Sequence, residues 1–225
     1  MNTTLTAPQE LQNDSLNNSI QLRVNGIIDD LIASLPDLRY LTSIERRGMI
    51  ARYTTVLEAN FIYWMTATYL AVQSESARPI LIENLHEEVR DAHPAMMRRF
   101  AIAAHAFPEA SDAFSVHKDL TNVRLFLGKL SAVQSILTMA FFEGFIQRFM
   151  PYLAALAEAQ GSTDMEYTDV HGVCDIAHTA GLFRALEEEM AINPLAPDKD
   201  LFEGVILLRT LLQSIVFGKI YSIAA

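Results

Sequence analysis

His171-Gly-Val-Cys-Asp175-Ile-Ala-His178 carries three side chains that commonly bind metals, at positions i, i+4 and i+7. At roughly 100° per residue, such positions on an α-helix return to within about 60° of one another. The spacing therefore predicts that two imidazoles and one carboxylate form a single stripe. Because imidazole nitrogen and carboxylate oxygen together suit iron, manganese or zinc, we interpret the three as candidate metal ligands. The alternative is a solvated helix face with an Asp–His pair.

Two isolated carboxylates strengthen this interpretation. Glu143 is the only charged residue in the segment 130–147, and Glu58 is the only one in the segment 53–74. A lone carboxylate in such apolar surroundings loses much of its hydration free energy unless a positive group meets it. A metal ion bound to the carboxylate would supply this positive charge. An arginine is the alternative partner for Glu143, and a helix surface is the alternative place for Glu58.

The composition bounds the class of protein. The chain has 225 residues, of which 51% are hydrophobic and 20% charged, enough for one core and too few for two ordinary domains. A formal charge of -10 argues against a nucleic-acid partner. The single cysteine, Cys174, cannot form an internal disulfide, and the polar start lacks the pattern of a secretory signal. The chain contains no run of 18 or more apolar residues, the length that a membrane-spanning helix needs. We therefore expect a soluble, cytoplasmic protein.

The periodicity predicts an all-α fold. Apolar residues recur at intervals of three and four, and the alternation typical of strands is missing. We expect residues 1–20 to be flexible and residues 21–225 to form a single domain. Caps, prolines and glycines divide that domain into seven or eight helices, over residues 19–35, 42–73, 79–91, 93–105, a shorter piece after Pro108, 120–158 with a kink near Pro151, 165–191 and 198–221.

A charged segment, 83–93, offers further donors, and the residues alone leave open which of them bind. On an unbroken helix His86 and His93 share one stripe and Glu87 sits at its edge, but a bend at the His93-Pro94 step would change that geometry. The number of donors suits two metals. The candidate metal ligands are Glu58, Glu87, His93, Glu143, His171, Asp175 and His178.

The segment 84–100, Asn-Leu-His-Glu-Glu-Val-Arg-Asp-Ala-His-Pro-Ala-Met-Met-Arg-Arg-Phe, resembles a stretch of the haem-oxygenase-like di-iron oxidases and oxygenases. The isolated Glu143 and the 171/175/178 motif complete the resemblance, which covers about residues 45–220. That family has the fold of haem oxygenase and of the TenA thiaminases, with a non-haem iron pair in place of haem. The resemblance implies a haem-oxygenase-like bundle of seven or eight helices.

The resemblance also implies roles for individual residues. Glu87 would lie between two irons, and Glu58 would be an extra carboxylate that some members recruit on oxygen binding. The chain departs from the family pattern in lacking the usual glycine after the Glu-Glu pair and in a short spacer before His93, which leaves Glu88 and His86 as alternatives. The implied ligands are, for one iron, His93, Glu143 and His178 and, for the other, His171 and Asp175.

Known members of that family oxidise amino acids, fatty acids or arginine-derived substrates. The resemblance therefore implies a non-haem di-iron oxidoreductase with two ferrous ions (Fe²⁺), O₂ as co-substrate and a small-molecule substrate. An amino acid of secondary metabolism is the first expectation and a medium-chain fatty acid the second. The reaction would be C–C cleavage, N-oxygenation, or formation of a nitrile or an alkene.

Three other interpretations stay open. A metal-free thiaminase-like enzyme would need a pocket cysteine, for which Cys174 is badly placed. A non-catalytic binding protein would need an exposed apolar stripe; the last helix offers one, although a core or homodimer role suits it as well. A ferritin-like di-iron protein would leave His93 and His171 idle and would use Glu58, Glu83-x-x-His86, Glu143 and Asp175-x-x-His178.

Overall fold

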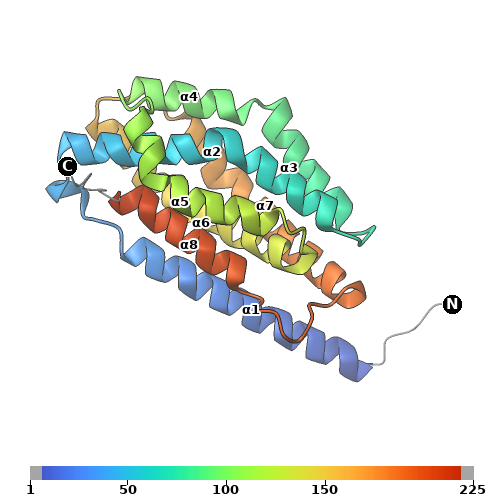
Figure 1. Ribbon diagram of the computed structural model, residues 1–225. Coiled ribbons are helices and arrows are strands. Elements are labelled where there is room, and N and C mark those ends of the chain that lie inside the picture. Colours follow the sequence, from blue (N-terminus) through green and yellow to red (C-terminus); the bar gives the residue numbers. More distant parts are fainter. Residues whose placement is uncertain (1–6, 219–225) are drawn as a thin grey trace.

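The computed structural model describes residues 7–218, with side chains described from residue 18 onward except that of Ala59. Within this range the chain folds into helices and has no strand, which confirms the predicted all-α class. The helices form an elongated bundle (Figure 1). In chain order they are α1 (Ala7–Ala33), the short 3₁₀ helix η1 (Leu38–Tyr40), α2 (Ser43–Ala71), α3 (Arg78–Arg90), α4 (His93–Ala103), α5 (Ala110–Leu127), α6 (Ala132–Ala159), α7 (Glu166–Ile192) and α8 (Glu203–Phe217).

Helix α6 forms the centre of the bundle. Every residue from Ala132 to Ile146 is buried, and helices α1, α2, α7 and α8 pack around it. A helix that is apolar all round is suited to a fully buried position. Glu143 lies in this buried stretch, so the fold itself places an acid in the core. Among the described helices, none is both long enough and apolar enough to cross a membrane.

The predicted break between the two helices of the 79–105 region is present. Helix α3 ends at Arg90 and α4 begins at His93, and between them Ala92 adopts the left-handed conformation with φ 55°. The chain therefore changes direction just before His93, which then faces inward and is buried. The capping box predicted at the start of α2 is also present, because the Thr42 N–H donates to the Glu45 carboxylate at 2.7 Å and the Thr42 hydroxyl accepts from the Glu45 N–H.

Other predicted boundaries were wrong. The segment 120–158 is not one helix: α5 ends at Leu127 and α6 begins at Ala132. Leu130 between them has φ 55°, a conformation that a continuous helix cannot include. Helix α1 begins at Ala7, earlier than expected, and residues 1–6 lie outside the described residues. Helix α8 begins at Glu203, later than expected, and its predicted end at 221 lies outside them too.

Substitution of Gly204 should destabilise the fold, because α8 lies very close to its neighbours at this residue. A Cβ at Gly204 would lie 2.1 Å from Thr138 Oγ1 and 2.3 Å from Phe126 Cε1, and both side chains are buried. We expect Gly204→Ala to lower the free energy of unfolding by about 1–3 kcal/mol through overpacking, measured by denaturant unfolding. Gly26→Ala is the control, since no atom lies within 4 Å of its Cβ, and it should raise stability by about 0.5–1 kcal/mol. Equal stability of the two variants would contradict this packing.

Candidate metal centre

Six titratable side chains from four helices converge in the core. Their exposed fractions run from 1% to 7%, so each is almost fully removed from water. Buried polar and charged groups persist only where they are paired, hydrogen-bonded or bound to a metal. They are Glu88 on α3, His93 on α4, Glu143 on α6, and His171, Asp175 and His178 on α7.

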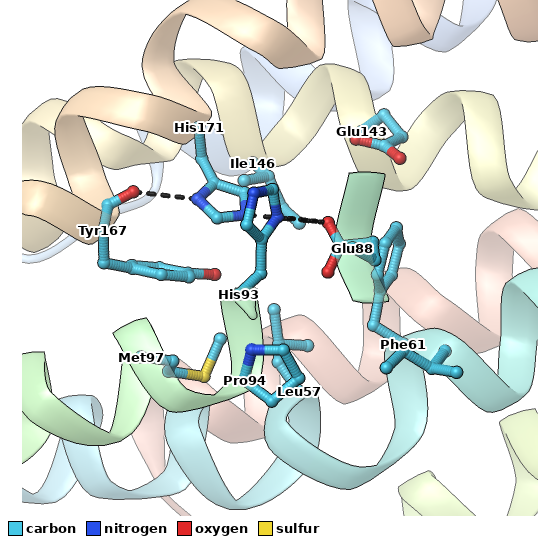
Figure 2. A pocket seen from close by; sticks show the side chains of 11 residues that line it. Leu57, Phe61, Glu88, His93, Pro94, Met97, Glu143, Ile146, Tyr167 and His171 are labelled. Carbon is cyan, nitrogen blue, oxygen red and sulfur yellow. Dashed lines mark hydrogen bonds and ion pairs between the residues drawn. The ribbon is translucent and has the colours of Figure 1, made fainter. Parts of the chain in front are cut away.

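The first group of donors consists of Glu88, His93 and His171. Glu88 Oε1 lies 2.8 Å from His93 Nδ1 and 3.7 Å from His171 Nε2. The two imidazole rings are 4.5 Å apart between centroids, and both point toward the carboxylate (Figure 2). One donor atom from each residue lies within 4.8 Å of the others. Two imidazoles and one carboxylate at this spacing can hold one metal ion.

The second group lies one to two turns further along α7. His178 Nδ1 is 3.7 Å from Asp175 Oδ1 and 3.8 Å from Glu143 Oε2. Among the described residues, Glu143 Oε1 and Asp175 Oδ2 have no hydrogen-bond partner, although both atoms are buried. A carboxylate oxygen left unsatisfied in the interior is costly, and a cation would satisfy both. The donor set therefore fits a second metal ion.

Cys174 lies beside this second group, next to Asp175. Its Sγ lies close enough to Asp175 and His178 to count as a donor, but the thiol donates to Asp175 Oδ1 at 3.2 Å. Burial and the neighbouring carboxylate raise the pKa of the Cys174 thiol well above its usual range. Because the thiolate is the nucleophile, a thiol held protonated in this way is poorly suited to nucleophilic catalysis.

Protons balance the buried acids in the absence of metal. Burial raises the pKa of Glu143 to about 8, and the nearby Asp175 adds to that rise. Burial disfavours the charged form of His178, but hydrogen bonds to Asp175 and Glu143 outweigh it and raise the pKa of His178 to about 11. Burial likewise opposes charge on His171, yet the hydrogen bond to Glu88 raises the pKa of that imidazole. The centre is therefore strongly attractive to positive charge.

Hydrogen bonds on the outer sides of two imidazoles fix their orientation. His171 Nδ1 donates to the Tyr167 carbonyl oxygen at 2.8 Å, which turns Nε2 toward Glu88. His178 Nε2 donates to Glu87 Oε2 at 2.8 Å, which turns Nδ1 toward Asp175 and Glu143. Metal-binding histidines usually donate their second N–H to a carboxylate or a carbonyl in this way. Glu87 therefore lies on the outer side of His178, with 30% of its side chain exposed.

The structure brings together five of the seven predicted ligands, and it adds Glu88. Glu87 contacts the cluster only from outside, and Glu58 is hydrogen-bonded to Arg98 instead. Of the alternatives that the sequence left open, the structure buries Glu88 and His93 and leaves His86 exposed. On α3, Glu88 shares one buried face with Leu81 and Asn84.

The bundle and its buried set of carboxylates and imidazoles define an all-helical protein with a candidate metal-binding centre in its core. A model of a family described as iron-containing redox enzymes matches residues 51–206. This match spans well over half of the chain and contains all six converging residues. The chain therefore belongs to this family of iron-containing redox enzymes, and the predicted haem-oxygenase-like bundle is confirmed. No curated protein matches the chain.

The raised pKa values predict how the stability of the metal-free protein depends on pH. The pKa of Glu143 rises from 4.5 to about 8 and that of His178 from 6.5 to about 11 on folding. Between pH 6.5 and 8 the folded state therefore binds protons that the unfolded chain has released, so stability should fall as pH rises. Thermal unfolding at several pH values measures this fall.

Glu143→Gln tests the origin of that pH dependence. The variant keeps the shape of the side chain but cannot titrate, so its melting temperature should fall less steeply between pH 5 and 8 than that of the wild type. Stabilisation by added Mn²⁺ should show the opposite trend and grow with pH, because metal binding displaces the same protons. Parallel pH profiles for variant and wild type would argue against a protonated Glu143.

Proposed function

We propose that this chain binds two ferrous ions and uses O₂ to oxidise a small molecule. The observation that carries the proposal is the presence of two buried donor groups that α7 joins, with His171 in the first and Asp175 and His178 in the second. Membership of a family of iron-containing redox enzymes supports iron as the metal. Nitrogen and oxygen donors in this combination also suit iron.

Each residue of the centre has a defined task under this proposal. Glu88, His93 and His171 would hold one ion, and Glu143, Asp175 and His178 the other. Bound iron would supply the electrons that reduce O₂. Glu87 accepts a hydrogen bond from His178 Nε2 and so keeps Nδ1 directed at the acids.

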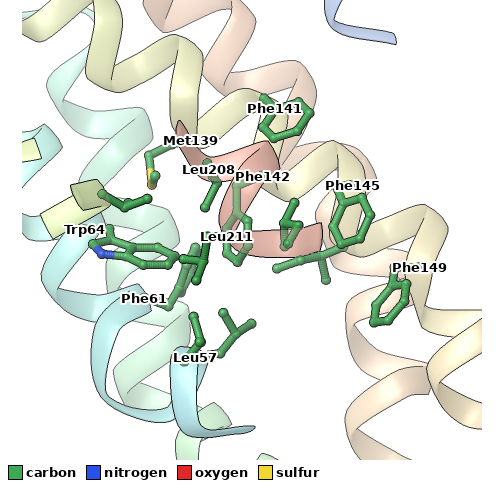
Figure 3. Close-up of a cluster of buried hydrophobic side chains, with 14 of the residues drawn as sticks. Leu57, Phe61, Trp64, Met139, Phe141, Phe142, Phe145, Phe149, Leu208 and Leu211 are labelled. Atoms are coloured by element: carbon green, nitrogen blue, oxygen red, sulfur yellow. The ribbon is translucent and has the colours of Figure 1, made fainter. Parts of the chain in front are cut away.

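An apolar wall separates the centre from solvent. The pocket beside Glu88 and His171 is lined on its other sides by Leu57, Phe61, Ile62, Pro94, Met97 and Ile146. Leu57 and Phe61 also belong to the buried cluster around Phe142 and Trp64 in Figure 3. Phe142 packs 5.6 Å from Phe61 and 5.4 Å from Trp64, measured between ring centroids. Such a rigid, dry wall would protect reactive species formed next to it from water.

The identity of the substrate stays a prediction. An amino acid of secondary metabolism and a fatty acid both fit an oxidase of this class. A cytoplasmic location and a homodimeric assembly are likewise predictions.

A ferritin-like arrangement is disfavoured by two placements. It would depend on Glu83 and His86, and both are exposed on α3. It would also leave His93 and His171 without a role, whereas both are buried beside Glu88. We therefore propose that the six residues of the two donor groups described above are the metal ligands.

Iron stoichiometry tests the proposal. The wild-type protein should bind about two Fe²⁺ under anaerobic conditions, measured by titration and elemental analysis. His171→Ala should lose the ion of the first group, and His178→Ala the ion of the second. His86→Ala is the matched control, because His86 lies on α3 but is exposed, and it should retain both ions. Wild-type iron content in both His171→Ala and His178→Ala would refute the proposal.

A further inference from the structure

Cys174 lies on α7 directly before Asp175 and one helical turn before His178. Residues four apart are neighbours on one helix face, so Cys174-x-x-x-His178 places a thiol next to an imidazole. Cys174 Sγ, a carboxylate oxygen of Asp175 and a ring nitrogen of His178 all lie within 4.8 Å of one another. The sulfur is therefore part of the second donor group by position, although the 171/175/178 stripe does not include it.

The separations between these donor atoms match those of ligands that share one ion. Metal bonds to oxygen, nitrogen and sulfur are about 2.0–2.3 Å long, so two ligands at ordinary coordination angles lie about 3–4 Å apart. Cys174 Sγ is 3.2 Å from Asp175 Oδ1, and His178 Nδ1 is 3.7 Å from the same oxygen. Sulfur, oxygen and nitrogen can therefore reach one ion together.

Two unpartnered carboxylate oxygens point independently to a cation at this group. Asp175 Oδ2 and Glu143 Oε1 are buried and, within the described part of the chain, have no hydrogen-bond partner. The residues that carry them are only 1% and 2% exposed, so water does not replace the missing partner. The thiol proton of Cys174 reaches Asp175 Oδ1 and not these atoms. A bound cation would satisfy both oxygens.

A bound cation also changes the state of the thiol. In the metal-free protein the thiol proton lies between Cys174 Sγ and Asp175 Oδ1. A thiol that coordinates a metal ion loses its proton outright, because the charge of the ion replaces that of the proton. The released proton passes to solvent, and the sulfur binds as a thiolate.

We propose that Cys174 is a thiolate ligand of the second ion, beside Asp175 and His178, and that it raises the preference of this position for Zn²⁺ over Mn²⁺. The proposal rests on the proposed function in one respect, that the second donor group binds a metal ion. The first donor group offers only nitrogen and oxygen. Thiolate ligands favour softer metals such as Zn²⁺, whereas carboxylates suit Mn²⁺. The two metal positions therefore differ in the ions that they select.

Cobalt spectroscopy of the full chain tests whether the sulfur binds the ion. Cys174 is the single cysteine of the chain, so a thiolate-to-cobalt charge-transfer band in the near ultraviolet can come from no other residue. We expect this band when stoichiometric Co²⁺ is added to the wild type under anaerobic conditions. Cys174→Ser should abolish the band, and its hydroxyl can keep the hydrogen bond to Asp175.

A matched control moves the thiol by one position. Cys174→Ser combined with Val173→Cys places the sulfur at a residue that is 71% exposed. On a helix this position points about 100° away from that of Cys174. The double variant should bind Co²⁺ as Cys174→Ser does and should show no charge-transfer band.

Calorimetric titration with Zn²⁺ and with Mn²⁺ tests the selectivity, in a His171→Ala background that removes the first position. Cys174→Ser should weaken Zn²⁺ binding by about tenfold or more, since even the loss of an outer hydrogen-bond partner costs about 10–100-fold. Mn²⁺ binding should stay within about twofold, because Mn²⁺ prefers oxygen ligands. Retained Mn²⁺ binding also demonstrates that the variant is folded.

The proposal fails if the cobalt-loaded wild type lacks the band, if the band survives in Cys174→Ser, or if this substitution weakens Zn²⁺ and Mn²⁺ binding equally. Metal stoichiometry separates this failure from failure of the proposed function. Two bound ions without the band overturn the role of Cys174 alone. Equal metal content in the wild type and in His178→Ala overturns the second metal position as well.

Discussion

Three carboxylates buried in an apolar core set the main constraint on this structure. Glu88, Glu143 and Asp175 are at most 6% exposed, and ionised acids in such surroundings require compensating positive charge. Three imidazoles meet them, and protons on His178 and Glu143 complete the compensation when no metal is bound. The same arrangement becomes a metal centre once cations replace the protons. Retention of so many buried acids is difficult to explain by stability, because apolar side chains of similar volume would pack without this cost.

The helices bring the donor residues together in two different ways. Helix α7 supplies three donors through simple periodicity, and α6 supplies Glu143 from its fully buried stretch, Ala132 to Ile146. The remaining pair, Glu88 and His93, are five residues apart, and on a straight helix they would point about 140° away from each other. The left-handed residue Ala92 breaks the helix between them, so that Glu88 Oε1 and His93 Nδ1 come within 2.8 Å.

The difference between these two ways explains which donor residues could be predicted from the sequence. The α7 stripe and the isolated Glu143 follow from local periodicity and polarity, which the sequence displays directly. The choice of Glu88 over Glu87 depends on the direction of the α3–α4 bend, and that direction is set by packing between helices far apart in the chain. Partners across helices, such as Arg98 for Glu58, depend on tertiary packing as well. The break between α5 and α6 was missed because the apolar periodicity continues through residues 128–131.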